Sequence, residues 1–259
     1  MKISFGFCEM ERLRQKLLIA NKLLIMRRIE VCCGCMEDVI AARDGGAVRV
    51  ELCSALGVGG VTPSAGLIVG AVRERGDMKI HVLIRPREGD FVYTSREVAV
   101  MEADIEAAKA AGADGVAIGA LKADGTVDEE AMRRLLGHCA GMSVTFHRAF
   151  DECADPLATL ETLIGYGVDR VLTSGCRESA AEGAELIRRL VDAAAGRIII
   201  MPGAGISPAN IARIEQMTGA PEFHGTASDK NEPQRASRLF GLTPRHTSAA
   251  IVRQLVESH

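Results

Sequence analysis

One phrase occurs four times along this chain of 259 residues, each time where a helical pattern gives way to an extended one. Each copy opens with glycine, which ends a helix in the left-handed conformation without a steric penalty. A short β-branched or aromatic run follows and ends in small or polar residues, as a strand does. The first copy reads GAVRVELCS and the third reads GVDRVLTSG; the four span residues 46–54, 112–120, 167–175 and 219–227.

The spacing of these copies predicts the fold. They lie about 52 to 66 residues apart, roughly twice the length of one βα unit. A further strand-like run precedes the first copy or lies between copies, at 29–33, 79–84, 143–147 and 197–201. Eight strands alternating with helical patterns indicate a single-domain α/β protein, a (β/α)8 TIM-type barrel, for which this length is usual. Its last helix is expected at 248–257.

Composition restricts the class of partner. The net charge of −3, with both signs interspersed, and an aromatic content of 3% argue against nucleic acid as a partner. No apolar run approaches the roughly 18 residues of a membrane span. The 8 cysteines lack the spacing of a disulfide framework, so without a signal peptide we expect reduced thiols in the cytoplasm. The expected assembly is a homo-oligomer, without a membrane partner.

Two segments fall outside the repeating pattern. Residues 1–25 carry charges where the apolar core of a secretion signal would lie, so we interpret them as a leader outside the barrel or a misassigned start. A helix that closes the amino-terminal face of the barrel is the alternative. The barrel itself is expected to span 26–259. Residues 229–243 form a long polar segment before the last helix, and no role is assigned to them.

Strand alternation predicts which side chains point into the barrel, because alternate residues of a strand face opposite sides. Aliphatic residues suit the outer face, against the helices. This leaves Glu30 and Cys32 of the first strand and Glu51 and Cys53 of the second pointing inward. The same alternation sends these pairs inward from later strands: Leu83 and Arg85, Thr145 and His147, Leu172 and Ser174, and His224 and Thr226.

The two glutamates need compensating charge, because an unpaired buried carboxylate costs several kcal/mol or loses its charge. Arg85, Arg87 and Arg148 are the nearest candidate partners. The polar residues collect near the carboxyl ends of the strands, where barrel enzymes place their chemistry. A buried ion-pair network that only fills the barrel is the alternative to a functional cluster.

The pattern Glu-x-Cys occurs in both of the first two strands. Adjacent strands lie roughly 4.8 Å apart, so Cys32 and Cys53 can bring two sulfur atoms together. Two thiolates in a reducing compartment suit Cu(I), whereas structural zinc usually needs four ligands. The alternative is that both are small buried residues, which cysteine commonly is.

His147 faces inward at the end of the fifth strand, followed by Arg148 and Asp151. It would act as a general acid or base near neutral pH, with Glu51 across the mouth as the complementary group, or serve only as a structural histidine. The two guanidinium groups of the loop 85–90 indicate an anion clamp or partners for the interior glutamates.

A glycine-rich loop, 202–206, follows the seventh strand. Loops at this position of a barrel often bind a phosphate through backbone N–H groups, although such loops also serve merely to turn the chain. The residues together allow a TIM-barrel enzyme of unknown reaction that acts on a small anionic substrate, phosphorylated or carboxylated. Its binding residues would be Glu30, Arg85, Arg87, Arg148, Asp151, Ser174, Gly203, Gly205 and His224.

Several stretches of the chain, taken in order, carry a resemblance to a known family. They include IRPREGDFVY at 84–93, TFHRAFDECADP at 145–156 and MPGAGIS at 201–207, with further matches at 50–66, 112–125 and 169–176. The chain resembles the CutC family of copper homeostasis proteins. The resemblance implies a TIM barrel, a cytoplasmic location and a role in copper handling, with Cu(I) ligands that correspond to Cys32 and Cys53. Residues 1–25 lie outside the resemblance.

Overall fold

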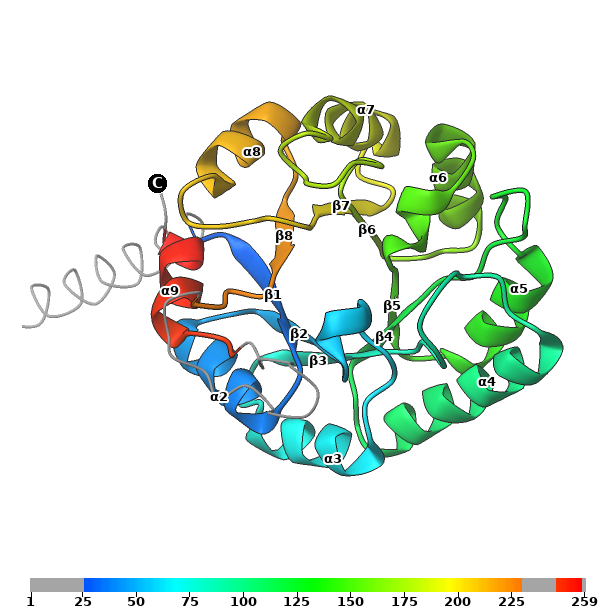
Figure 1. Ribbon diagram of the computed structural model, residues 1–259, viewed down its shortest axis with the longest axis horizontal. Coiled ribbons are helices and arrows are strands. Elements are labelled where there is room, and N and C mark those ends of the chain that lie inside the picture. The colour runs from blue at the N-terminus through cyan, green and yellow to red at the C-terminus, as the bar shows by residue number, and fades with distance from the viewer. Residues whose placement is uncertain (1–25, 230–245, 258–259) are drawn as a thin grey trace, which may run out of the picture.

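The computed structural model describes residues 26–229 and 246–257. Its eight parallel strands form one sheet in the order β7-β6-β5-β4-β3-β2-β1-β8, and Figure 1 shows them around a central axis. The expected (β/α)8 barrel is therefore confirmed. The strands are β1 (Arg28–Cys33), β2 (Arg49–Leu52), β3 (Lys79–Leu83), β4 (Gly115–Ile118), β5 (Ser143–Phe146), β6 (Arg170–Thr173), β7 (Ile199–Pro202) and β8 (Glu222–Gly225).

Eight α-helices of the described chain surround the strands (Figure 1). The last helix, α9, begins at Ala249, one residue later than expected from the sequence, and ends at Glu257 as expected. The expectations for 1–25 and for nearly all of 229–243 concern residues outside those that the structure describes. The helices are α2 (Met36–Gly45), α3 (Ala65–Glu74), α4 (Ser95–Ala110), α5 (Glu129–His138), α6 (Pro156–Gly165), α7 (Ala184–Ala194), α8 (Ile211–Thr218) and α9 (Ala249–Glu257).

The glycine that opens each repeated phrase has a positive φ, as the sequence pattern requires. The values are 89° at Gly46, 87° at Gly112, 71° at Gly167 and 68° at Gly219. Gly46 is the residue after α2, and its N–H donates to carbonyl oxygens of the last helical turn. Only glycine takes this left-handed conformation without strain, so these positions turn the chain from a helix into the next strand.

Polar caps fix where several helices begin. The hydroxyl of Thr94 accepts the N–H of Glu97, whose carboxylate accepts the N–H of Thr94 in return, and this capping box starts α4. The carboxylate of Asp155 accepts two backbone N–H groups at the start of α6, where Pro156 occupies the first helical position. These local contacts position the helices that cover the sheet.

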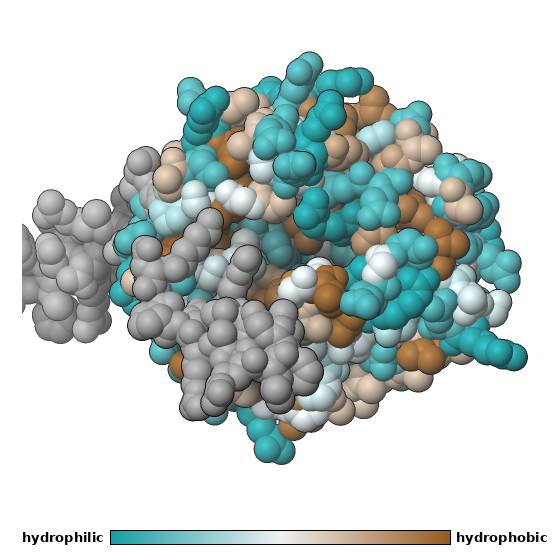
Figure 2. Space-filling view, in the orientation of Figure 1, coloured by the Kyte–Doolittle hydropathy of each residue, from teal (hydrophilic) through white to brown (hydrophobic). Residues whose placement is uncertain are grey.

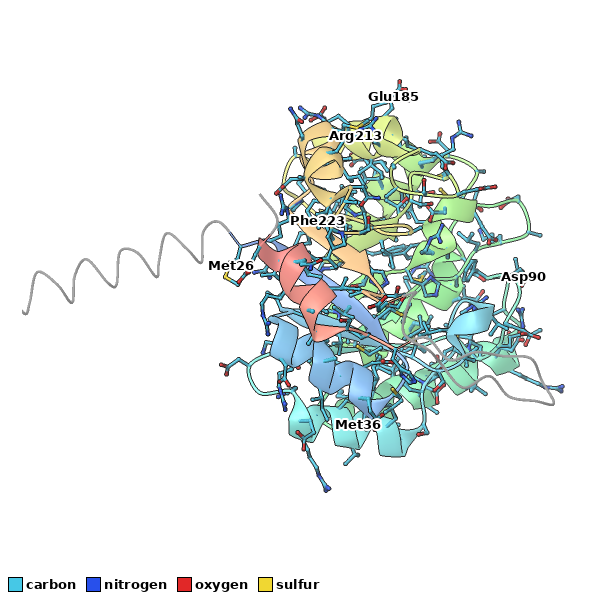
Figure 3. The ribbon with its side chains drawn as sticks, turned by 60° about the vertical axis from the view of Figure 1, so that its left-hand side comes forward. Met26, Met36, Asp90, Glu185, Arg213 and Phe223 are labelled. Carbon is cyan, nitrogen blue, oxygen red and sulfur yellow. The ribbon has the colours of Figure 1, made fainter. Side chains whose placement is uncertain are left out.

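The apolar core has two parts, as strand alternation predicts. Val31, Val50 and Val82 point outward and belong to the large core between the sheet and the helices. Phe223 of β8 lies in the same core (Figure 3). A separate small cluster inside the barrel consists of Cys32, Cys53, Leu83 and Ala117. The rest of the interior is largely polar.

A buried ion-pair network fills the amino-terminal half of the barrel. Arg49 forms ion pairs with Glu30 and with Glu222, the second at 2.6 Å, and Arg170 reaches Glu222 at 3.0 Å. The prediction that loop arginines neutralise the interior glutamates is therefore wrong for Glu30. The register of β1 and β2 places Glu30 directly beside Arg49, which is closer than any loop residue.

Candidate functional site

A cavity of about 770 Å³ opens at the carboxyl ends of the strands. Figure 2 looks onto this end of the barrel and shows hydrophilic side chains around a hollow at its centre. In Figure 3 the same end carries Asp90, while Met26 lies at the opposite end. Seven of the candidate binding, catalytic and metal-ligand residues line the cavity: Cys32, Glu51, Arg85, His147, Arg148, Asp151 and His224.

Two thiols meet at the wall of this cavity. The Sγ atoms of Cys32 and Cys53 lie 3.5 Å apart, and Cys32 Sγ lies 3.5 Å from a carboxylate oxygen of Glu51. Cys53 is fully buried behind Cys32. The contact with Cys53, together with burial, raises the pKa of Cys32 well above its usual value. Both sulfur atoms are thus within reach of one bound ion, provided that the ion displaces the thiol protons.

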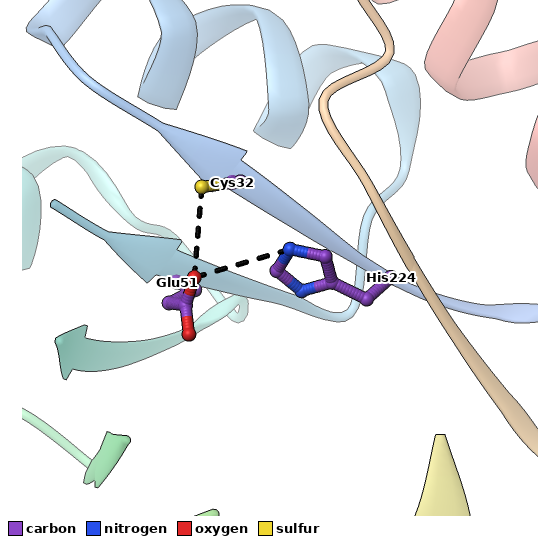
Figure 4. Close-up of side chains that lie close together, drawn as sticks. All are labelled: Cys32, Glu51 and His224. Atoms are coloured by element: carbon purple, nitrogen blue, oxygen red, sulfur yellow. Dashed lines mark hydrogen bonds and ion pairs between the residues drawn. The ribbon is translucent and has the colours of Figure 1, made fainter. Parts of the chain in front are cut away.

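Glu51 and His224 continue a chain of polar contacts from the thiols into the barrel (Figure 4). The Nε2 atom of His224 lies 3.9 Å from Glu51, and its Nδ1 atom lies 2.8 Å from Glu30. Burial raises the pKa of Glu51, which has no arginine or lysine in contact among the described residues. Burial opposes the charge of His224 as well, but the hydrogen bond to Glu30 and the nearby Glu51 raise its pKa.

Glu30 stays ionised although it is fully buried. Burial alone would raise its pKa, but the Arg49 guanidinium and the hydrogen bond from His224 lower it well below the usual value. Glu30 therefore supports His224 from beneath the cavity instead of lining it. Cys32, Glu51 and His224 place one potential ligand atom each within 4.8 Å of one another, close enough for one metal ion to contact all three.

His147 is fixed as a neutral hydrogen-bond donor. Its Nδ1 atom accepts the N–H of Ala149 at 3.2 Å, so the proton of the neutral ring is on Nε2. Burial, with help from Arg85, lowers the pKa of His147 to about 3. Nε2 is buried without a hydrogen-bond partner among the described residues. A ring with this pKa is a weak base, so the geometry suits donation to a ligand better than proton exchange near neutral pH.

Arg85 is held by the backbone instead of by the glutamates. Its NH1 group donates to the carbonyl oxygens of Val58 and Gly60, and NH2 donates to Gly89. The guanidinium also lies 5.1 Å from the centre of the Phe91 ring. Its Nε atom, like His147 Nε2, is buried and lacks a partner within the described part of the chain. No carboxylate of the described residues forms an ion pair with Arg85.

Asp151 joins two loops at the mouth. Its carboxylate accepts Arg148 Nε at 2.7 Å and the backbone N–H groups of Ser174 and Cys176 at about 3 Å. Arg148 also donates to Ser174 Oγ at 2.9 Å. Ser174 is fully buried in this junction and does not line the cavity. Arg148 thus reaches the cavity with its charge already partly neutralised.

Besides Glu30 and Ser174, four further expected positions lie outside the cavity. Arg87 forms ion pairs with Glu97 at 2.6 Å and Asp90 at 2.9 Å, outside the barrel. The N–H of Gly203 donates to Thr173 because β6 and β7 stay paired to this point, so it is not free for a phosphate. The other two positions are Gly205, which does not line the cavity, and Thr226, which is exposed beyond the end of β8.

Sequence reasoning missed four charged or titratable residues of the interior. Arg49, His81, Arg170 and Glu222 are all buried inside the barrel. Each lies two residues before a residue whose inward direction alternation predicts, so extending the alternation to the amino end of each strand would have found them. Burial lowers the pKa of His81 to about 4, which keeps this ring neutral beside the arginines.

Known proteins of similar sequence identify the family of this chain. The family model of the CutC family matches residues 27–229. This chain belongs to the CutC family. The copper homeostasis protein cutC homologs of Mus musculus and Homo sapiens are each 48% identical to this CutC chain, over 89% and 86% of its length and 82% and 79% of theirs. A family protein CutC of Xylella fastidiosa strain Temecula1 is 51% identical over 88% of this chain and 87% of its own.

A crystal structure of the CutC protein from Streptococcus agalactiae superposes with a TM-score of 0.75 at 36% identity. The superposition covers 78% of this CutC chain and 99% of that one. Other barrels are alike in fold alone, such as thiamine phosphate pyrophosphorylase from Pyrococcus furiosus, with a TM-score of 0.56 at 14% identity. Within the described residues of the CutC chain, no helix has the length and apolar character needed to cross a membrane.

Proposed function

We propose that this protein takes part in copper homeostasis in the cytoplasm by binding one Cu(I) ion between Cys32 and Cys53. The observation that carries the proposal is the pair of thiols 3.5 Å apart at the wall of the cavity. The names of the mouse and human relatives support a role in copper homeostasis. Soft thiolate ligands select Cu(I) over hard ions, so the donor chemistry agrees with that role.

The geometry around the thiols fits a small ion with few ligands. Metal–thiolate bonds of roughly 2.3 Å allow two sulfur atoms to lie up to roughly 4.6 Å apart. The observed 3.5 Å therefore suits a bent site, and a linear one needs the side chains to separate by about 1 Å. Glu51 accepts the S–H of Cys32 and is the nearest group to receive that proton when an ion binds.

An anaerobic competition titration with a chromogenic Cu(I) chelator tests the proposal. We expect Cys32→Ser and Cys53→Ser each to weaken Cu(I) binding more than about 100-fold, since even the loss of a residue that only orients a ligand costs roughly 10 to 100-fold. Cys139→Ser is the matched control, because Cys139 is also buried but donates to Leu135 in α5. Equal Cu(I) affinities of the Cys53 and Cys139 variants would refute the site.

A second function is favoured by two donors, Arg85 Nε and His147 Nε2, which lack a partner among the described residues and belong to side chains that line one cavity. A buried donor without a partner is unfavourable, and an oxygen atom of a carboxylated or phosphorylated ligand would satisfy it. The second candidate function is therefore an enzyme of unknown reaction that acts on such a ligand, with Glu51 and His224 as the groups that exchange protons.

A thermal-shift screen of phosphorylated and carboxylated metabolites tests this second function. A ligand at 100 times its dissociation constant stabilises a fold by about 2.7 kcal/mol, which raises Tm by roughly 5 to 10 °C at this size. We expect His147→Gln and Arg148→Met to reduce that shift, and Arg87→Met, outside the cavity, to preserve it. If no anion raises Tm, or if all three variants respond as the wild type does, the enzyme function is rejected.

A further inference from the structure

A second group of metal-ligand side chains lies outside the cavity, at the carboxyl end of β1. Cys35, Asp38 and His246 each place one potential ligand atom within 4.8 Å of the others. Cys35 Sγ lies 3.6 Å from His246 Nδ1, which lies 3.5 Å from Asp38 Oδ1. Cys35 immediately precedes Met36, the first residue of α2, which Figure 3 labels. None of the three residues lines the cavity.

We propose that Cys35, Asp38 and His246 bind a borderline divalent metal ion such as Zn²⁺. Zinc bonds of roughly 2.0 to 2.3 Å at tetrahedral angles place neighbouring ligand atoms roughly 3.4 to 3.6 Å apart. The two measured separations, 3.5 and 3.6 Å, agree with that spacing before any ion is added. Three protein ligands leave the fourth position to water or to an external ligand.

The carboxylate of Asp38 is oriented as a ligand would be. Asp38 is 2% exposed, and its two oxygens accept the backbone N–H groups of Gly34 at 3.0 Å and Thr247 at 2.8 Å. Each oxygen keeps a further lone pair, so these bonds fix the direction of the carboxylate without consuming it. Its single ion-pair partner among the described residues is His246. A divalent ion would supply the positive charge that this buried group otherwise lacks.

Helix capping explains Asp38 but not the whole group. A carboxylate in the first turn of α2 stabilises the helix, and its bond to Thr247 anchors the segment before α9. Cys35, however, occupies the N-cap position without a side-chain capping bond, and its sulfur contacts the His246 ring instead. A contact between a thiol and an imidazole contributes little to capping, whereas the two are the commonest zinc ligands.

The ligands come from both sides of the junction between β1 and β8. Cys35 and Asp38 follow β1, while His246 precedes α9 next to Thr247, which bridges to Ser228 beyond β8. An ion at this position would tie the first and last βα units together. Its mixed sulfur, nitrogen and oxygen donors favour a borderline divalent ion, in contrast to the paired thiols of the cavity.

Titration of the full, reduced chain with Co²⁺ tests the proposal, because Co²⁺ replaces zinc and reports its ligands by absorbance. We expect a thiolate-to-cobalt charge-transfer band together with the visible bands of tetrahedral Co²⁺, and we expect Zn²⁺ to abolish both. Cys35→Ser should remove the charge-transfer band. His246→Gln, at a side chain that is 42% exposed and tolerant of replacement, should weaken Co²⁺ binding more than about 100-fold.

The control variants distinguish this site from the cavity. The double variant Cys32→Ser and Cys53→Ser should keep the cobalt spectrum, as should Cys139→Ser. A charge-transfer band that survives Cys35→Ser and disappears in the double variant would place the ion in the cavity and overturn the proposal. A wild-type chain that shows no such band with excess Co²⁺ would overturn it as well. Circular dichroism of each variant verifies that the barrel is folded.

Discussion

The carboxylates of Glu30 and Glu222 share one buried guanidinium, that of Arg49. Arg49→Met would keep the volume but leave Glu30 without its strongest partner. Removal of one member of a buried ion pair costs about 3 to 5 kcal/mol, and urea unfolding should show a decrease of this size in the free energy of unfolding.

Arg28→Met is the control. Arg28 also forms an ion pair with Glu222, but its side chain is 57% exposed, so the free energy of unfolding should fall by less than about 1 kcal/mol. Equal losses would show that Glu222, not Arg49, limits stability.

His81 and His147 should make the fold sensitive to acid. Burial lowers their pKa values to about 4 and about 3, from 6.5 in the unfolded chain. Their contribution is thus complete above about pH 6.5 and is lost as the pH falls toward those values, because the unfolded chain then binds protons that the native state does not. For His81 the loss is on the order of 3 kcal/mol.

Urea unfolding between about pH 7 and about pH 4 measures this effect. Glu51 and His224 titrate with the opposite sign, because their raised pKa values favour the native state at low pH. The informative quantity is therefore the difference between variants. His81→Gln should flatten the pH dependence relative to the wild type, and an unchanged slope would show that folding does not lower the pKa of His81.

Alternation within single strands was sufficient to predict the inward direction of Glu30, Cys32, Glu51 and Cys53. The partner of Glu30 was not predictable in the same way. Its pairing with Arg49 depends on the register between β1 and β2, which neither strand encodes alone. Register and loop geometry together decided which arginine neutralises which carboxylate.

At the scale of elements, the repeated glycine is a property of the backbone, which gives a matched pair of substitutions. Gly46 has a φ of 89° and open space where the β-carbon of an alanine would lie, so Gly46→Ala meets backbone strain alone. We expect the free energy of unfolding to fall by about 1 to 2 kcal/mol.

Gly137 lies inside α5, and the space around its missing β-carbon is equally open. Gly137→Ala should instead stabilise the fold by about 0.5 to 1 kcal/mol. Thermal unfolding of both variants measures the two signs; the same sign in both would contradict the role given to the repeated phrase.

The elements were predictable because each repeated phrase joins a local turn signal to a strand signal. The loops were not. The segment with Gly203 has the glycine pattern of a phosphate-binding turn, yet its N–H completes the sheet with Thr173. Arg87 likewise turns away to Glu97 at the start of α4. Both outcomes depend on where a strand ends and which helix cap lies nearby, and these are tertiary features.

Residues 1–25 contribute none of the eight repeating units, so their removal should leave the barrel folded. We expect a chain that begins at Met26 to melt within about 5 °C of the full chain, which corresponds to roughly 2 kcal/mol or less at this size. Differential scanning calorimetry of the two chains compares them directly. A larger decrease in Tm would mean that residues 1–25 contribute to the stability of the fold.

The whole barrel is polarised along its axis. The amino-terminal half is filled by the ion pairs of Arg49 and Arg170 with their carboxylates. The carboxyl-terminal half holds the cavity, the thiols and two donors that have no partner in the described part of the chain. His224 joins the two halves through Glu30 and Glu51. If an ion or ligand binds in the cavity, the buried ion pairs beneath it would remain in place.

Binding of Cu(I) should therefore stabilise the entire fold, and to a degree that depends on pH. The raised pKa of Cys32 means that this side chain is a neutral thiol in the free protein, so an ion that binds its sulfur atom must displace that proton. Each unit by which the pH falls then lowers Cu(I) affinity by about tenfold, or about 1.4 kcal/mol. At 100 times the dissociation constant, bound Cu(I) stabilises the fold by about 2.7 kcal/mol, so Tm should rise by roughly 5 to 10 °C near pH 8. About half of that increase should be lost one pH unit lower, and anaerobic melting of Cu(I)-loaded wild type and Cys53→Ser measures it. An increase in Tm that is independent of pH, or that persists in Cys53→Ser, would show that the ion binds to groups other than these thiols.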